Sequence, residues 1–122
     1  MIDYKEGKMA KAKPRKILLY KERSGKEPFT EWHKSLRDTQ AKGRILRRLR
    51  MLEQGHRGDY KALGAGLFEL RFFFGSGYRV YYGEDGVDII IILCGGDKAS
   101  QRRDIDKAQS YWTDYKLRRD AR

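Results

Sequence analysis

Two arginines and two aromatic residues lie at alternate positions on either side of a glycine-rich turn. Arg71 and Phe73 precede Gly75-Ser76-Gly77, and Arg79 and Tyr81 follow it. Because side chains alternate along a strand, a three-residue turn that sets Arg71 opposite Tyr81 brings all four side chains to one face. Guanidinium groups match phosphate oxygens, and aromatic rings stack on unpaired bases. The pattern therefore predicts a surface that binds single-stranded RNA.

The other face of this hairpin carries the residues expected in the core, Leu70, Phe72, Phe74, Val80 and Tyr82. The grouping depends on the turn, since a two-residue turn would place Arg71 opposite Val80 or Tyr82. A structural alternative also exists for the arginines. Arg71 or Arg79 would then pair with Glu69 or another acid on a solvated face, where an ion pair contributes little stability.

Cleavage of RNA at a 2′-hydroxyl requires alignment of that oxygen with the phosphorus, proton transfer and stabilisation of the phosphorane. Arginine suits the stabilising role because it stays charged, and for the same reason it is a poor base. Lys61 and Lys98 flank the hairpin region and add cations that border the same face. The chemistry indicated is phosphate binding and electrostatic stabilisation.

No other set of residues predicts a catalytic or metal centre. The two histidines, His33 and His56, are not brought together by their spacing, and each favours a packing or surface role. Acidic residues near the start of the last predicted helix favour capping over metal binding, namely Asp97, Asp104 and Asp106. We therefore expect no metal and no cofactor.

Composition narrows the class of protein. The chain has 122 residues, 28 Lys and Arg against 17 Asp and Glu, and a net charge of +11. Such a charge favours a polyanionic partner, either nucleic acid or an acidic protein.

The single cysteine, Cys94, excludes an intrachain disulfide and a zinc site built from cysteines. No apolar run reaches the length of a membrane span, and the first residues do not resemble a secretory signal, so we expect a cytoplasmic protein with no membrane partner.

The N-terminal half predicts an arm, a strand and two helices. Residues 1–14 are basic and unpatterned and are expected to form a flexible arm. Residues 16–20 favour a strand, and Pro28 begins a helix with an apolar face. A second helix is expected at about 41–54, and its opposite face carries the cations Lys42, Arg44, Arg47, Arg48 and Arg50. The short connection between the helices predicts an antiparallel hairpin.

The C-terminal half predicts a meander of three antiparallel strands at 67–74, 78–83 and 87–94, followed by a helix. The run 89–93 is apolar throughout, which favours a central strand covered on both faces. The expected fold class is α+β, in the order strand, helix, helix, three antiparallel strands, helix. The helical hairpin packs on one face of a twisted sheet, and the last helix closes an edge or end and leaves part of the other face open.

Several motifs, in this order, resemble the RelE/ParE superfamily of type II toxin–antitoxin toxins. They are Pro28-Phe29-Thr30-Glu31-Trp32, Glu69-Leu70-Arg71, Gly75-Ser76-Gly77-Tyr78-Arg79-Val80-Tyr81-Tyr82, Leu93-Cys94-Gly95-Gly96-Asp97-Lys98 and Lys107-Ala108-Gln109-Ser110-Tyr111-Trp112. The greatest similarity is to the HigB-like, phage-derived addiction module killer proteins. The resemblance implies a single domain of small RelE-like fold over residues 15–118, followed by a charged tail at 119–122.

This resemblance implies a ribosome-dependent, metal-independent mRNA endoribonuclease that inhibits translation and is neutralised by a cognate antitoxin, expected to be of the helix-turn-helix type. Arg79 matches a position that stabilises the scissile phosphate, and Lys98 falls near a second catalytic arginine. Arg71 lies on the strand that carries general-base lysines in RelE-type enzymes. The residues expected to bind RNA around them are Lys61, Phe73, Tyr81, Arg47 and Arg48.

Two alternatives remain open at this stage. The same fold includes inhibitors of DNA gyrase of the ParE type, which have no nuclease activity. The second alternative is a basic binding module without toxicity.

Overall fold

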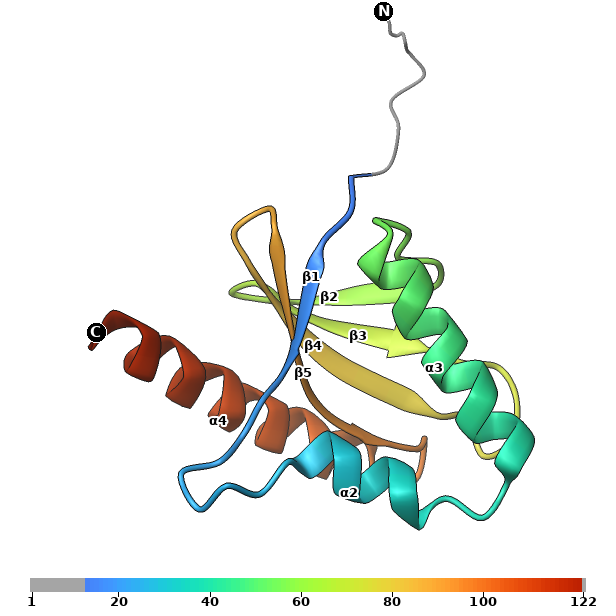
Figure 1. The fold of residues 1–122 in the computed structure, drawn as a ribbon. Helices are drawn as coiled ribbons and strands as arrows, with labels where there is room; N and C mark the ends of the chain where they lie inside the picture. Colours follow the sequence, from blue (N-terminus) through green and yellow to red (C-terminus); the bar gives the residue numbers. More distant parts are fainter. Residues whose placement is uncertain (1–12, 122) are drawn as a thin grey trace, which may run out of the picture.

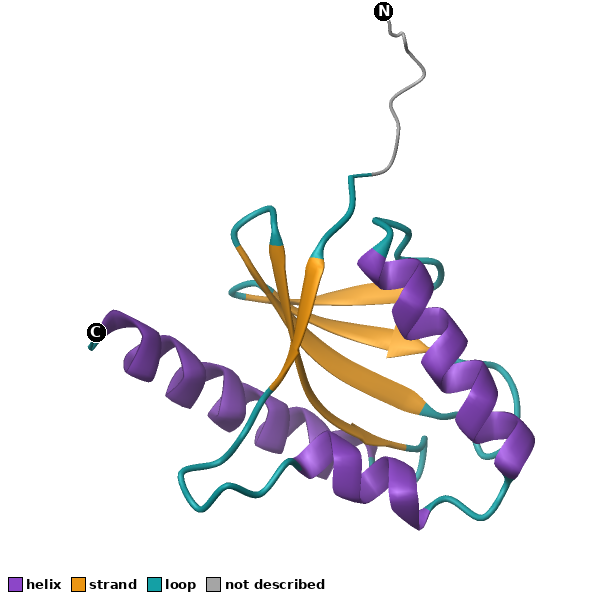
Figure 2. Ribbon diagram, viewed as in Figure 1, coloured by secondary structure: helices purple, strands orange, loops and turns teal. Residues whose placement is uncertain are grey.

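A five-stranded mixed sheet forms the centre of the computed structural model, which describes residues 13–121 (Figures 1 and 2). Its strand order is β1-β5-β4-β3-β2. The strands and helices are β1 (Lys16–Leu19), α2 (Pro28–Ser35), α3 (Thr39–Glu53), β2 (Tyr60–Gly64), β3 (Leu67–Arg71), β4 (Arg79–Asp85), β5 (Ile89–Gly96) and α4 (Gln101–Asp120). The α+β class is confirmed. Residues 1–12 of the predicted arm lie outside the described residues.

Strand β5 occupies the position that its apolar run predicts. It lies between β1, with which it pairs in parallel, and β4, with which it pairs antiparallel. Residues 90–93 are at most 1% exposed. Helices cover both faces at this point, so every side chain of the run meets an apolar environment.

Helices α2 and α3 pack on one face of the sheet, as the sequence predicts. Pro28 stands in the first turn of α2, where a missing amide hydrogen is tolerated. The Asp38 carboxylate caps α3 by accepting hydrogen bonds from the backbone N–H groups of residues 40 and 41. The apolar face of the hairpin forms one core with the sheet through Phe29, Ile45, Leu49, Leu52, Leu70, Val80 and Ile92.

Helix α4 lies across the opposite face, where the sequence predicted only that it would close an edge or end. Ala108 and Trp112 pack with Leu67, Tyr81 and Ile91 in a second core. The Trp112 indole covers Gly83, where an added Cβ would lie 2.4 Å from the ring. The helix includes residues 119 and 120 of the predicted charged tail. Among the described residues, no helix has the length and apolarity needed to cross a membrane.

The meander differs from the prediction in two respects. Strand β2 was not predicted, because its residues are mostly exposed and show no apolar alternation. The β3–β4 connection is also longer than the predicted three-residue turn, since β3 ends at Arg71 and β4 begins at Arg79. Arg71 therefore opposes Arg79, and Glu69 opposes Tyr81, in a register shifted by two residues. A shift by an even number leaves the predicted division between the two faces intact.

One ion-pair network fastens the N-terminal end of the described chain to the sheet. The Glu84 carboxylate of β4 accepts hydrogen bonds from Arg57 Nε at 2.9 Å and Nη2 at 2.8 Å, and from Arg15 Nη1 at 3.1 Å. Burial alone would raise the pKa of Glu84, but the hydrogen bonds from Arg57 and Arg15 outweigh it and lower the pKa. The ionised carboxylate is thus stabilised in the folded state.

We predict that Glu84→Gln lowers the free energy of unfolding at pH 7 by roughly 2–3 kcal/mol, because two guanidinium groups lose their partner. Since the folded pKa of Glu84 lies below the unfolded one, its contribution is complete above the unfolded pKa and is lost as the pH falls through the folded pKa. Urea unfolding of both proteins from pH 7 to pH 3 measures this. The difference between them should shrink as the pH falls; a constant difference would contradict the assignment.

Candidate functional site

One end of the sheet face that α4 covers remains open and contains a cavity of about 470 Å³. Its lining comes from β2, β3, the β3–β4 loop, β4, the β5–α4 turn and the first residue of α4: Lys61, Glu69, Arg71, Phe72, Phe73, Gly75, Gly77, Arg79, Lys98 and Gln101. Five residues predicted as catalytic or RNA-binding therefore surround one cavity, namely Lys61, Arg71, Phe73, Arg79 and Lys98. Glu69 is the one acidic residue among those that line it.

The two arginines are direct cross-strand partners, Arg71 on β3 and Arg79 on β4. Like charges at opposed positions destabilise a strand pair. Each has only a distant carboxylate: Arg71 Nε lies 3.9 Å from Asp59 Oδ2, and Arg79 Nε lies 3.9 Å from Glu69 Oε2. Neither Nε–H group finds a hydrogen-bond acceptor within residues 13–121. The alternative interpretation paired each arginine with Glu69 or another acid. The structure contains such a pair for each arginine, but both pairs are long, at 3.9 Å.

The β3–β4 loop fixes the position of Arg79. Its Nη1 donates hydrogen bonds to the carbonyl oxygens of Gly77, at 2.9 Å, and Tyr78, at 3.2 Å. Gly77 has a φ of +76°, which favours glycine, and an added Cβ would lie 3.3 Å from the Cβ of Lys98. The loop thereby brings Lys98 and Arg79 to the same wall of the cavity.

Glu69 forms the floor of the cavity and was not predicted as a site residue. Its side chain is 1% exposed, and its Oε2 accepts hydrogen bonds from Gln101 Nε2 at 2.8 Å and from the Tyr81 hydroxyl at 3.2 Å. These bonds connect β3, β4 and α4 at one carboxylate, which also faces Arg79. The alternation in Glu69-Leu70-Arg71 was the signal that would have placed Glu69 on this face.

Tyr81 does not belong to the RNA-binding surface, contrary to the sequence prediction. The side chain is fully buried, and its hydroxyl donates to Glu69. Burial first, and then the neighbouring Glu69 carboxylate, raise the pKa of Tyr81. Helix α4, which was expected to lie at an edge, covers this ring and makes it part of the core.

Arg48 is also a structural residue. Its guanidinium donates to the carbonyl oxygens of Arg71 at 3.0 Å, Arg57 at 3.2 Å and Asp59 at 3.1 Å, and it lies 4.8 Å over the ring centroid of Phe72. Burial lowers the pKa of this guanidinium. Arg48 thus fixes the chain that enters β2 and leaves β3, and three of its N–H donors are used for this. Its neighbour Arg47 is exposed and lies outside the cavity that contains Arg71.

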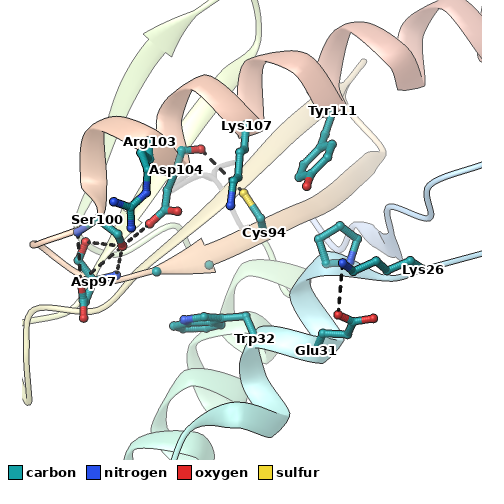
Figure 3. A pocket seen from close by; sticks show the side chains of 13 residues that line it. Lys26, Glu31, Trp32, Cys94, Asp97, Ser100, Arg103, Asp104, Lys107 and Tyr111 are labelled. Atoms are coloured by element: carbon teal, nitrogen blue, oxygen red, sulfur yellow. Dashed lines mark hydrogen bonds and ion pairs between the residues drawn. The ribbon is translucent and has the colours of Figure 1, made fainter.

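A second cavity of about 400 Å³ lies on the other side of the β5–α4 turn, between α2 and α4 (Figure 3). Its charges largely balance one another. Its lining has three cations and three carboxylates, and Lys26 pairs with Glu31 at 3.6 Å. The Ser100 hydroxyl lies within hydrogen-bond distance of the Asp97 and Asp104 carboxylates. Burial raises the pKa of the Cys94 thiol to about 12, which makes it a poor nucleophile at neutral pH. Cys94 is therefore not a candidate nucleophile of this cavity.

The histidines lie elsewhere, as the sequence predicted. A ring nitrogen of His33 is 3.1 Å from the carbonyl oxygen of Lys42, and the ring stacks on Phe29. Neither His33 nor His56 lines the cavity between the two arginines. Within residues 13–121, no three His, Cys, Asp or Glu side chains are grouped so as to hold a metal ion.

The family model of the Gp49-like phage-derived proteins (DUF891) matches residues 31–112, which include every residue that lines the arginine cavity. The chain belongs to this family. Gp49-like proteins are toxin–antitoxin toxins related to RelE and HigB. This Gp49-like chain is also 42% identical over 81 residues to an uncharacterized protein of Haemophilus influenzae; the match covers 66% of the chain and 82% of that protein.

We predict opposite effects on stability for the two arginines of the cavity. Arg71→Gln should leave the free energy of unfolding unchanged or raise it by up to about 0.5 kcal/mol, because it removes like-charge repulsion. Arg79→Gln should lower it by roughly 1–2 kcal/mol, because two loop carbonyls lose their donor. Urea unfolding at pH 7 measures both. Equal destabilisation by the two changes would show that Arg71 is a structural residue.

Proposed function

We propose that this Gp49-like protein is the toxin of a type II toxin–antitoxin module and cleaves mRNA on the ribosome. One observation carries the proposal: Arg71 and Arg79 face each other across one strand pair, with Lys98 beside them and no acid that fully compensates them. A phosphate group supplies the missing negative charge. The two guanidiniums offer it a pair of planar donor groups.

In the proposed reaction the scissile phosphate lies between Arg71 and Arg79. Their charge stabilises the phosphorane that forms when the 2′-oxygen attacks phosphorus and gives its proton to water or to a base of the ribosome; the bond between phosphorus and the 5′-oxygen then breaks. Lys98, which is exposed at the rim, protonates the departing 5′-oxygen or stabilises its charge. Phe73 stacks on a base next to the phosphate, and Lys61 binds the backbone at the opposite rim.

The ribosome completes the site in this proposal. No histidine lines the cavity, so the chain itself contributes mainly positioning and electrostatic stabilisation. The net charge of +11 attracts the protein to ribosomal RNA through counterion release, most of it from cations that have no part in the reaction. The cytoplasm is the compartment in which this target occurs.

Neutralisation by a cognate antitoxin follows from the same charges. An acidic antitoxin segment over Arg71, Arg79 and Lys98 would compensate the arginines and exclude the mRNA phosphate. A helix-turn-helix antitoxin is proposed from the family resemblance.

Transcript-end mapping in bacteria that express the protein without an antitoxin tests this function. Wild type and Arg50→Ala, which removes an exposed α3 cation outside the arginine cavity, should arrest growth and produce new 5′ ends within coding regions. Arg71→Gln and Lys98→Ala should reduce cleavage roughly 10²-fold, because a group that stabilises the transition state is removed.

Three outcomes contradict the proposal. Intact transcripts during growth arrest exclude mRNA cleavage. Intact transcripts together with broken chromosomal DNA and an SOS response indicate a gyrase inhibitor instead. Normal growth without an antitoxin indicates a non-toxic binding module.

A further inference from the structure

A third cavity, of about 240 Å³, lies between α3 and the β3–β4 loop. One side of α3 lines it at helical spacing with Arg44, Arg47, Arg48 and Met51, and the loop contributes Phe72, Phe73 and Phe74. Phe72 and Phe73 also line the arginine cavity. The two neighbouring cavities thus share these two phenylalanines, of which Phe72 is buried and Phe73 is exposed.

The third cavity is strongly cationic. Its lining includes three arginines and no carboxylate. Arg48 is bound to backbone carbonyls, whereas Arg44 lies 5.1 Å over the ring of Phe74 and Arg47 has no hydrogen bond or ion pair within the described residues. Arg44 and Arg47 therefore remain able to bind an anion.

Phe73 lies on a loop that backbone hydrogen bonds close, and its ring is exposed. Phe73 is 84% exposed, so its ring is available to stack on a base. The loop around it is closed by hydrogen bonds from the Phe72 N–H to the Tyr78 carbonyl, at 3.0 Å, and from the Gly77 N–H to the Phe74 carbonyl, at 3.2 Å. These bonds close the loop around Phe73 and leave its ring in solvent.

We propose that the third cavity binds the nucleotide adjacent to the scissile phosphate. Its base enters between Phe73 and Met51, and its outer phosphate is bound by Arg44 and Arg47. Phe73 then lies between two consecutive bases, one in each cavity. The inference rests on the proposed function, because it takes single-stranded RNA as the substrate, and it assigns to Arg44 and Phe73 a part in choosing where the RNA is cut.

The combination of groups favours a nucleotide over an acidic peptide. Aromatic rings beside guanidiniums present a stacking surface and an anion site within one nucleotide's length. A carboxylate side chain would use the cations and leave the exposed Phe73 ring without a flat partner. Continuity with the phosphate-binding cavity across this ring supports the same occupant.

Binding of a short RNA that cannot be cleaved tests this site separately from catalysis. The probe is a fluorescein-labelled tetranucleotide with 2′-fluoro riboses, followed by anisotropy. We expect Arg44→Ala and Phe73→Ala each to weaken binding roughly 10-fold, and Phe73→Tyr to retain wild-type affinity. Arg50→Ala is the matched control, because it removes one exposed arginine from the same helix outside the cavity, and it should change affinity less than about 2-fold.

Abasic substitution locates the base. Removing the base at one position of the probe should weaken wild-type binding roughly 10-fold and have no further effect on Phe73→Ala. Arg44 and Phe73 are both exposed, so circular dichroism and thermal unfolding should show intact folds.

The outcomes separate this inference from the proposed function. Equal weakening by Arg44→Ala and Arg50→Ala would overturn the inference, since only the overall charge would then matter. Wild-type affinity in both Arg44→Ala and Phe73→Ala would also overturn it; if these variants then escape an antitoxin, the cavity is a protein-binding site. Failure of the proposed function appears instead as intact transcripts with the wild-type protein, whatever the anisotropy shows.

Discussion

The opposition of Arg71 and Arg79 is the interaction on which the rest of the site depends. Two guanidiniums at directly opposed positions repel each other, and the strand pair must hold them against that repulsion. The chain does so with carboxylates at ion-pair distance and with carbonyls of the β3–β4 loop, but it leaves both Nε–H groups without an acceptor among the described residues. A pair of cations that keeps two N–H donors without an acceptor before its ligand arrives is preorganised for an anion.

The fold maintains this arrangement from both sides of the sheet. Arg48 of α3 reaches the backbone of Arg71, and Gln101 of α4 reaches Glu69 beneath Arg79. Gly96, the cross-strand partner of Arg79 on β5, has no side chain, and Asp104 and Ser100 occupy that space. The helices thus position the charged residues as well as covering the sheet. A change in either helix is expected to reach the cavity through one of these hydrogen bonds.

Most of the fold and the general position of the site could be predicted from the sequence. The continuous apolar run at 89–93 predicted the central strand, and alternation along the hairpin placed Arg71 and Arg79 on one face because an error of two residues in register does not exchange faces. Strand β2 could not be predicted, since an exposed edge strand held by backbone hydrogen bonds leaves little pattern in its side chains. The roles of Tyr81 and Arg48 also required the structure, because they depend on the path of α4 and of the chain around β2.

We predict that both buried Nε–H groups acquire an acceptor when RNA binds. NMR of arginine Nε–H signals measures this directly, in a titration with an uncleavable 2′-fluoro tetranucleotide. The signals of Arg71 and Arg79 should shift together and exchange more slowly with solvent, whereas the signal of the exposed Arg50 should move little. Equal shifts at all three arginines, or none at Arg71 and Arg79, would contradict the claim that this pair binds the phosphate.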